Sequence, residues 1–371
     1  MIKVCHMTSV HIPEDVRIFH KECVSLARAG YEVYLVQRGE SYEKKGVHLV
    51  GFGKPSSNRL GRMLFDARKA YRAALAVDAD IYHFHDPELL PYGLKLKKKG
   101  KKVIFDSHER YVRQIQAKPY LPPRLAALAA KLYGSYERHV LRRIDAAILP
   151  CTFNGENPLA GLCRRTLLIS NAAILSEFYD LYSPAAPKKE RQVCYVGGLT
   201  EARGVTAAVK AAGLADARLA LAGGFSPPGY EERLRAMPEF SGADFRGRLD
   251  RAGVAALLSE SQAGLCALLN RGQYWELDTF SIKVFEYMSM GLPVILSTTP
   301  YNKEAAERYG FGLCVDPENT EEYAAAIRYL LDHPEEARQM GENGRKAVKE
   351  EFNWGVEEKK LLALYEEILN E

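Results

Sequence analysis

The sequence lacks the cysteine patterns of a disulfide framework or of a cysteine-ligated zinc site. Its seven cysteines are an odd number, and no two of them form a Cys-x-x-Cys pair. Paired spacings of that kind are what indicate disulfide scaffolds and zinc ligands. Cys194 and Cys266 lie within strand-like apolar runs, so we expect them to be small buried hydrophobic residues.

Long apolar segments are also missing. No hydrophobic run reaches the roughly 20 residues that a helix needs to cross a bilayer. The first residues, MIKVCHM, do not lead into the apolar stretch of a secretory signal. These features predict a cytoplasmic protein.

The loop after the first predicted strand, TSVHIPEDVRI, has no Gly-x-Gly-x-x-Gly motif. Because that motif cradles the pyrophosphate of a dinucleotide, its absence argues against a nicotinamide-dependent dehydrogenase built on this strand. No recognised module for reading nucleic acid appears either, so no nucleic-acid partner is expected.

Net charge is unevenly distributed along the chain. Residues 1–185 contain 29 Lys and Arg against 18 Asp and Glu, or +11; the remainder contains 22 against 29, or −7, and the sum is +4. The basic half either faces anionic lipid or a phosphorylated substrate, or is only a solvated surface.

Two predicted helices, residues 59–76 and 123–143, lie in this half. The second is basic and partly amphipathic, as is typical both of helices on membrane surfaces and of helices that cover a sheet.

A chain of 371 residues, 47% hydrophobic and 26% charged, suits two globular domains. Strand-like and helix-like segments alternate throughout, which predicts parallel sheets covered by helices. The Pro- and charge-rich residues 183–192 predict a linker between a first domain, 1–182, and a second, 193–352. A C-terminal helix, about 353–371, is able to pack back on the first domain. We therefore predict an α/β protein with two Rossmann-like, doubly wound domains that face a central cleft.

Three loops of the first half place titratable side chains at predicted strand ends. They contain, in order, His11, Asp15 and Arg17; His83, His85 and Asp86; and Asp106, His108 and Glu109. Because the carboxyl ends of parallel strands meet at one edge of a sheet, three such groups indicate a cleft. The candidates for acceptor binding are His11, Asp15, Arg17, His85, Asp86 and Glu109.

His83 and His85 share one face of a strand, which raises the question of a metal ion. No third and fourth ligand accompany them at a metal-site spacing, so a polar substrate contact or a satisfied buried pair is preferred. No metal is therefore expected. The pair Asp78 and Asp80 precedes its strand, away from the expected cleft, and is interpreted as a turn.

Two glycine pairs follow strands in the second half. Gly197 and Gly198 precede a helix that begins near Arg203, and Gly223 and Gly224 repeat the arrangement one unit later. Glycine lets a backbone approach a ligand closely, and a cation beside a helix start suits a diphosphate. Both turns are candidates for nucleotide binding.

The segment ELDTFSIKVFEYMSMGLPVI predicts a helix over residues 281–290, followed by a strand. Lys283 and Glu286 are three residues apart on one face of its first turns, where free N–H groups and the helix dipole attract anions. This arrangement indicates a phosphate-binding site with a carboxylate beside it. Ser281 and Ile282 also belong to this site. The alternative is an exposed salt-bridged pair on an ordinary core helix.

With these motifs, the whole chain resembles a family-four glycosyltransferase of the GT-B fold. The resemblance rests on TSVHIPEDVRIFHKE, HFHDPELL with IFDSHE, YVGGLTEARGV and DTFSIKVFEYMSMGLPVI. The last is the most specific, because the family has two acidic residues with seven between them, then Gly-x-Pro-Val. Here these are Asp278, Glu286, Gly291 and Pro293.

The resemblance implies roles for individual residues. Glu286 would hold the ribose hydroxyls, Lys283 and Arg203 would neutralise the diphosphate, and His108 matches a histidine near the donor sugar. The expected catalytic residues are His108, Asp278 and Glu286. The expected donor-binding residues are Gly197, Gly198, Arg203, Gly223, Gly224, Ser281, Ile282, Lys283 and Glu286.

The implied function is retaining transfer of a hexose-type sugar from a nucleotide diphosphate, UDP- or GDP-linked, to an acceptor hydroxyl. Bacterial surface polysaccharide or glycolipid synthesis is the expected setting. The expected partners are the nucleotide sugar, a glycan or lipid-linked acceptor, and an anionic membrane contacted peripherally at the inner face of the cell membrane. No cofactor beyond this co-substrate is expected. The alternatives are a nucleotide-sugar epimerase of the same fold and a non-catalytic nucleotide-sugar-binding protein.

Overall fold

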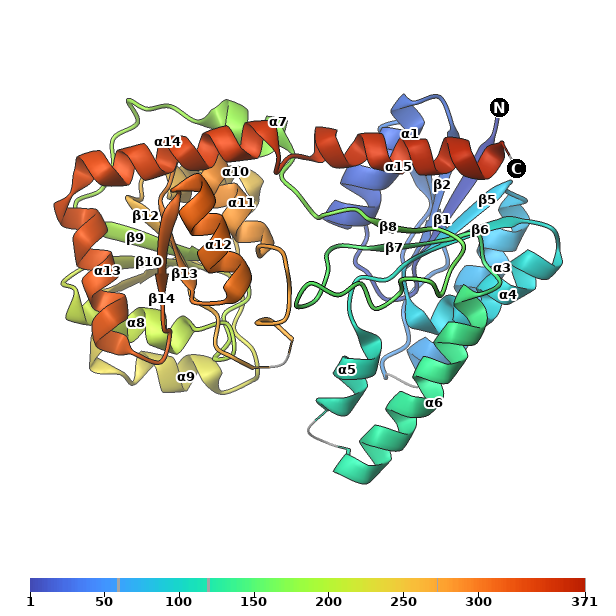
Figure 1. Cartoon of the computed structure of the whole chain (residues 1–371), viewed down its shortest axis with the longest axis horizontal. Coiled ribbons are helices and arrows are strands. Elements are labelled where there is room, and N and C mark those ends of the chain that lie inside the picture. Colours follow the sequence, from blue (N-terminus) through green and yellow to red (C-terminus); the bar gives the residue numbers. More distant parts are fainter. Residues whose placement is uncertain (59–60, 119–120, 272, 371) are drawn as a thin grey trace. The chain divides into compact units, whose positions relative to one another are not determined.

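The computed structural model describes residues 1–58, 61–118, 121–271 and 273–370. The chain forms two compact units, one of Met1–Asn171 with Gly355–Glu371, the other of Ala172–Trp354. In each unit helices cover a largely parallel sheet (Figure 1). The division at Asn171 lies before the predicted linker, residues 183–192, which belongs to the second unit.

The first unit contains an eight-stranded sheet with the order β3-β4-β2-β1-β5-β6-β7-β8. Its strands are β1 (Lys3–Met7), β2 (Glu32–Gln37), β3 (Tyr42–Lys44), β4 (Val47–Gly51), β5 (Ile81–Phe84), β6 (Lys102–Asp106), β7 (Ala146–Leu149) and β8 (Thr166–Leu168). Neighbouring strands are parallel except for β3 and β4, which form an antiparallel edge.

The helices of the first unit cover this sheet. They are η1 (Val16–Cys23), α1 (Val24–Arg28), η2 (Arg62–Asp66), α3 (Ala67–Val77), η3 (Pro87–Leu89), α4 (Leu90–Lys98), α5 (Tyr111–Gln116), α6 (Pro123–Leu141) and α15 (Trp354–Leu369). The helix predicted over 59–76 corresponds to η2 and α3, and its first two residues, 59 and 60, lie outside the described part of the chain.

The second unit contains a six-stranded parallel sheet with the order β11-β10-β9-β12-β13-β14. Its strands are β9 (Gln192–Val196), β10 (Arg218–Ala222), β11 (Ala243–Phe245), β12 (Ala263–Cys266), β13 (Val294–Ser297) and β14 (Gly312–Val315). Its helices are α7 (Leu175–Phe178), η4 (Tyr179–Leu181), α8 (Val205–Leu214), α9 (Tyr230–Arg235), η5 (Pro238–Gly242), α10 (Arg251–Ser259), α11 (Ile282–Ser289), α12 (Pro300–Tyr309), α13 (Thr320–Asp332) and α14 (Pro334–Glu350).

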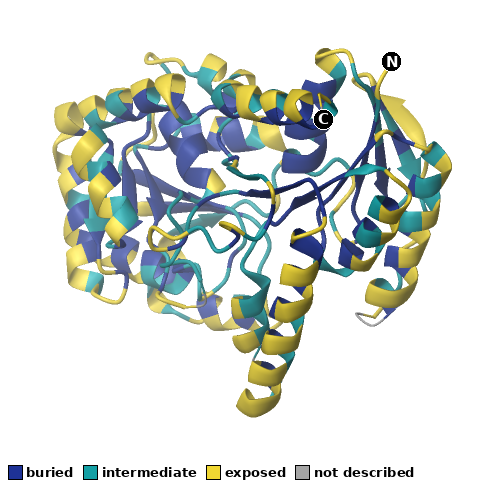
Figure 2. Ribbon diagram, turned by 45° about the vertical axis from the view of Figure 1, so that its right-hand side comes forward, coloured by how far each residue is buried: buried dark blue, intermediate teal, exposed yellow. Residues whose placement is uncertain are grey.

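Alternation of side chains along the strands explains why both faces of this second sheet are covered. Along β9, Val193 and Tyr195 join a core shared with α8 and α13, whereas Cys194 and Val196 join one shared with α10 and α11. In Figure 2 the strands are accordingly buried, and the outer faces of the helices are exposed. This is the doubly wound arrangement predicted from the sequence.

Helix α11 is fixed to the sheet by one aromatic side chain. The ring of Tyr287 covers Gly264 on β12, where a Cβ atom would lie 2.3 Å from Tyr287 Cδ2. The Tyr287 hydroxyl oxygen accepts a 2.9 Å hydrogen bond from the backbone N–H of Val196 on β9. Tyr287 therefore connects α11 to β12 and to the carboxyl end of β9.

None of the helices among the described residues combines the length and the apolarity that crossing a bilayer requires.

Candidate active site

The carboxyl ends of β9 and β10 bring the two glycine turns together. The backbone N–H of Gly197 donates to Ala222 O at 2.9 Å, and that of Leu199 donates to Gly224 O at 2.9 Å. Both glycine pairs line a pocket of about 430 Å³, together with Arg248 and other residues. The pairs predicted separately thus form one wall of a single pocket.

Only glycine fits at the centre of these turns. Gly197 has φ +127°, and a Cβ atom there would lie 3.2 Å from Lys283 Cε. Gly223 has φ +150°, and its Cβ would lie 1.7 Å from Gly197 O. The turns therefore pack directly on each other and on Lys283.

Lys283 lies in the first turn of α11 with its side chain turned inward. The residue is 5% exposed, and its ammonium lies 3.7 Å from the centre of the Tyr195 ring. Within the described chain, Nζ has no hydrogen-bond partner. Burial lowers the pKa of Lys283 to about 8, with a smaller contribution in the same direction from Arg203. The site therefore contains a buried cation that forms no ion pair with any carboxylate of the described residues.

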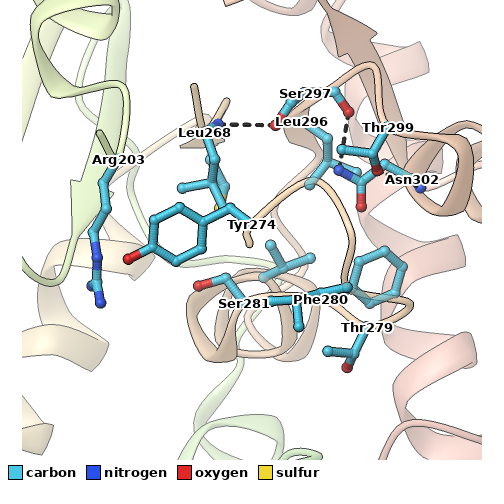
Figure 3. Close-up of a pocket in the computed structure, with 13 residues that line it drawn as sticks. Arg203, Leu268, Tyr274, Thr279, Phe280, Ser281, Leu296, Ser297, Thr299 and Asn302 are labelled. Carbon is cyan, nitrogen blue, oxygen red and sulfur yellow. Dashed lines mark hydrogen bonds between the residues drawn. The ribbon is translucent and has the colours of Figure 1, made fainter. Parts of the chain in front are cut away.

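Arg203 supplies a second cation at the same place. Its Nη1 lies 3.1 Å from where a Cβ of Gly198 would stand and 3.9 Å from that of Gly197. Figure 3 shows its side chain beside the Tyr274 ring, at the edge of a pocket of about 110 Å³. Two cations and a helix N-terminus thus lie around the first glycine turn, which is a suitable environment for a diphosphate.

Glu286 is paired with Arg251 and not with Lys283. Its Oε1 accepts a 2.7 Å hydrogen bond from Arg251 Nη1, and Arg251 also contacts Glu177. Glu286 is 8% exposed, and burial raises its pKa. The alternative of an exposed Lys283–Glu286 salt bridge is therefore wrong, because both residues are buried and Glu286 binds another cation.

The remaining donor-site candidates lie at the start of α11 and in the loop before it. Ser281 is the N-cap residue but makes no side-chain capping bond, and it lines the pocket of Figure 3. Ile282 is 41% exposed, and Asp278 is half-buried in the preceding loop. The roles of these three residues stay predictions.

In the first unit, side chains from the three predicted strand-end groups meet around Asp106. This buried carboxylate accepts hydrogen bonds from Arg17 Nε at 2.7 Å and Nη2 at 3.0 Å. His85 Nδ1 and His108 Nε2 lie 3.3 Å and 3.2 Å from Asp106 Oδ2. His11 packs on His108 with ring centres 4.7 Å apart. The three predicted strand-end groups are therefore one cluster.

Three of the predicted acceptor contacts are buried in this structure: Arg17, His85 and Asp86 are 4%, 0% and 2% exposed. Their role in acceptor binding stays a prediction. Arg17 and His85 contact Asp106, and Asp86 accepts from Thr8 Oγ1 at 2.8 Å. They hold the strand-end loops together, and such use of polar groups in a buried network is not visible in spacing along the chain.

His11, Asp15 and Glu109 are only partly buried, so they remain candidates for acceptor contact. Asp15 caps η1 by accepting from the backbone N–H groups of Arg17 and Ile18. Glu109 lines a pocket of about 210 Å³ within the first unit, and burial raises its pKa.

Several side chains that shape these sites were not predicted from the sequence. Arg251 orients Glu286, the Tyr195 ring supports Lys283, and the Arg248 guanidinium covers Gly224. One weak signal was available: α10 begins at Arg251, with Asp250 as its side-chain cap, and follows a strand of the second unit.

Comparison with known proteins matches both halves of the chain. The profile of the family described as "Glycosyltransferase Family 4" matches residues 17–157, and that of "Glycosyl transferases group 1" matches residues 182–347. The MMP alpha-(1->4)-mannosyltransferase of Mycolicibacterium hassiacum is 30% identical over 117 residues, which are 31% of this chain and 27% of that protein. The matched part thus spans about a quarter of this curated relative.

Solved structures are similar over the full length. Sucrose-phosphate synthase from Thermosynechococcus elongatus superposes with a TM-score of 0.78 at 20% identity, covering 100% of both chains. Anabaena HepE, solved in complex with UDP and glucose, has a TM-score of 0.72 at 13% identity over 99% of this chain and 100% of that one. These likenesses establish the fold. With the two family profiles, they show that the chain belongs to the family-four glycosyltransferases of the GT-B fold.

Proposed function

We propose that this chain is a retaining transferase that moves a hexose-type sugar from a nucleotide diphosphate to an acceptor hydroxyl. The second unit would bind the donor, with its diphosphate between Lys283, Arg203 and the start of α11. We propose a UDP- or GDP-sugar as donor, and synthesis of a bacterial surface polysaccharide or glycolipid as the setting.

One observation carries this proposal: the buried ammonium of Lys283 has no hydrogen-bond partner among the described residues. A buried charge without a counter-charge is unfavourable, and Arg203 beside it adds a second charge of the same sign. A diphosphate would supply two negative charges at this point. The glycine turns would leave room for it, because neither Gly197 nor Gly198 has a side chain.

The same groups suit the chemistry of transfer. In the proposed reaction the bond between the anomeric carbon and the diphosphate oxygen breaks, and a bond from that carbon to the acceptor oxygen forms. The departing diphosphate takes the electron pair of the broken bond and accepts the acceptor's proton. Lys283, Arg203 and the helix N-terminus would stabilise its growing negative charge. Glu286, oriented by Arg251, would hold the ribose hydroxyls.

The surface of α6 supports a membrane-linked acceptor. Leu125, Leu128 and Leu132 are 57%, 53% and 63% exposed on this helix, and basic side chains lie among them. Its single acid, Glu137, is buried and accepts a hydrogen bond from Tyr133. In Figure 2 this long helix at the lower edge is exposed along most of its length. An anionic bilayer is complementary to such a basic, apolar surface.

The donor site can be tested with a thermal-shift panel of UDP, GDP, ADP, CMP and their sugar conjugates. A ligand at a hundred times its Kd should stabilise the protein by about 2.7 kcal/mol. We expect one nucleotide family to shift the wild type, and the double variant Lys283→Ala, Glu286→Ala to lose the shift. Lys210→Ala, an exposed lysine in α8, is the matched control and should keep it. No shift in the wild type with any nucleotide would contradict the proposed site.

Incubating the protein with the donor that the thermal-shift panel identifies distinguishes sugar transfer from the two alternative functions. With an acceptor, the product should keep the anomeric configuration of the donor, as NMR coupling constants report. Conversion of the donor sugar without any acceptor would indicate an epimerase. Nucleotide binding with neither transfer nor hydrolysis would indicate a binding protein.

Membrane contact can be tested by sedimentation with vesicles that contain phosphatidylglycerol. Replacing Lys131 and Arg138 with Gln should weaken binding roughly 30-fold, because each basic residue near an anionic surface contributes about 1 kcal/mol. The control is Lys346→Gln with Lys349→Gln on α14 in the second unit. Equal binding of both double variants would contradict a role for α6.

A further inference from the structure

Four side chains of ligand type meet in the interior of the first unit. They are His6 on β1, Glu22 in η1, His83 on β5 and His85 just after β5. All four are 0% exposed. One ligand atom from each can be chosen so that all four atoms lie within 4.8 Å of one another.

Three of these atoms form a triangle close to metal-site dimensions. His6 Nδ1 lies 3.0 Å from His85 Nε2, and each of these nitrogens lies 3.8 Å from Glu22 Oε2. In a tetrahedral site with metal–ligand distances near 2.1 Å, the ligand atoms are about 3.4 Å apart. Small side-chain shifts would therefore place an ion at bonding distance from all three atoms.

The cluster also contains polar atoms that lack partners. Among the described residues, neither carboxylate oxygen of Glu22 nor Nε2 of His83 has a hydrogen bond. The contacts of Glu22 are ion pairs instead: Oε1 lies 3.1 Å from Arg17 Nε, and Oε2 lies 3.8 Å from both His6 Nδ1 and His85 Nε2. Buried polar atoms are rarely left in this state, so the cluster has room for one more electropositive group.

The other ring nitrogens of the three histidines all face oxygen atoms. The Tyr365 hydroxyl lies 3.1 Å from His6 Nε2 and 2.9 Å from His83 Nδ1. His85 Nδ1 lies 3.3 Å from Asp106 Oδ2 and also 3.2 Å from His108 Nε2. Ligating histidines usually have this arrangement, in which one nitrogen binds the metal and the other is oriented by a hydroxyl, a carbonyl or a carboxylate.

The charges are consistent with a bound cation. Two carboxylates, Glu22 and Asp106, share the buried guanidinium of Arg17. One guanidinium balances one carboxylate, so a cation beside Glu22 would balance the other.

We propose that His6, Glu22, His83 and His85 bind one divalent transition-metal ion, with Zn²⁺ as the best match to three imidazoles and one carboxylate. Four protein ligands and complete burial make this a closed structural site, without an open position for a substrate. The ion joins β1, η1 and β5, and through Tyr365 it fixes α15 to the sheet. The proposal is independent of the proposed transfer reaction.

A second group, His85, Asp106 and His108, is a weaker candidate. It offers only three ligands, and its carboxylate already accepts two hydrogen bonds from Arg17. We therefore assign the ion to the group that contains Glu22.

The test measures metal content and affinity of the full chain. Elemental analysis after Zn²⁺ loading and gel filtration should give one ion per chain, and Co²⁺ loading should give the visible absorption of a tetrahedral site. Glu22→Gln should weaken Zn²⁺ binding by more than a hundredfold. Tyr365→Phe, which keeps the ring and all four ligands, should weaken it about 10- to 100-fold. His48→Gln, at a half-buried position on β4 outside the cluster, should leave it unchanged.

Chelation gives a second readout that does not depend on any variant. Removing the ion should lower the Tm and raise amide hydrogen exchange in residues 355–370, because α15 loses its fixed contact. Less than 0.1 ion per chain after loading would overturn the proposal. So would Zn²⁺ affinity equal to wild type in both Glu22→Gln and Tyr365→Phe. Loss of binding in His108→Gln with full binding in Glu22→Gln would assign the ion to the second group and overturn the site proposed here.

Discussion

The two units bury charge in opposite ways. In the second unit, Lys283 is a buried cation without a hydrogen-bond partner among the described residues, whereas Glu286 nearby is matched by Arg251. In the first unit, Arg17 hydrogen-bonds to Asp106, whereas Glu22 has only an ion-pair share of Arg17 and accepts no hydrogen bond from the described residues. Matched pairs such as these hold the fold together. Buried groups that remain unmatched indicate where a ligand of the opposite charge would bind, an anion in one unit and a cation in the other.

The largest effect is expected from breaking the ion pair between Arg17 and Asp106 in the first unit. Arg17→Met leaves two buried carboxylates without their cation, and we expect it to lower the free energy of unfolding by about 3–5 kcal/mol. Urea denaturation at pH 7 measures this loss. Arg28→Met, at an exposed position in α1, is the control. A loss below about 1 kcal/mol would mean that the pair contributes little.

The pH dependence of the Arg17→Met defect has a definite sign. Arg17 helps to hold the pKa of Asp106 well below its usual value, so this contribution is present above the pKa of an unfolded Asp and is lost as pH falls. The difference in stability between wild type and variant should therefore shrink in acid.

A second prediction tests the crowding around the unmatched cation. Gly197→Ala places a Cβ 3.2 Å from Lys283 at a φ of +127°, so it should lower stability by about 1–3 kcal/mol and weaken nucleotide binding at least tenfold. Isothermal titration and thermal unfolding report the two effects. Gly242→Ala, where a Cβ would meet nothing within 4 Å, is the matched control. Unchanged binding would place the diphosphate elsewhere.

A third prediction separates the units by function. His108→Ala removes a contact to Asp106, and we expect it to lower kcat about 5- to 30-fold, as loss of about 1–2 kcal/mol of hydrogen bonding would. Nucleotide Kd should stay the same, because the proposed donor site lies in the other unit. His139→Ala, at an exposed position of α6, serves as control. A normal kcat in His108→Ala would remove this residue from the proposed mechanism.

The smallest effect is a pH dependence of donor binding. The pKa of Lys283 is about 8 in the free protein, and a bound diphosphate would raise it, so affinity should fall as pH rises above 8. For one proton, the fall between pH 8 and pH 9 is roughly fivefold. Titration of the nucleotide across this range checks it. Lys283→Arg should abolish the dependence, whereas a flat wild-type profile would mean that Lys283 does not contact the phosphates.

Much of the fold was predictable because local patterns set it. Alternating strand and helix periods predicted two parallel sheets, and the helix predicted over 281–290 is α11 (Ile282–Ser289). The division between the units was placed later in the chain than the structure places it, because composition marks the segment 183–192 but contacts decide where a unit ends.

The site was predictable only in part. The sequence predicted Lys283, Arg203 and the glycine turns as donor-site candidates, and the structure places them close together. The partner of Glu286 was not found, because Arg251 comes from a different helix.

The sequence by itself determined the order of strands and helices, the glycine turns and the placement of polar residues at strand ends, because these follow from periodicity and from backbone geometry. Only the tertiary structure decided which charges are matched. His83 and His85 looked like half of a metal site without further ligands, and folding brings His6 and Glu22 to them from other elements. Ligand sets and ion pairs form between distant segments, so their distances exist only after the chain has folded.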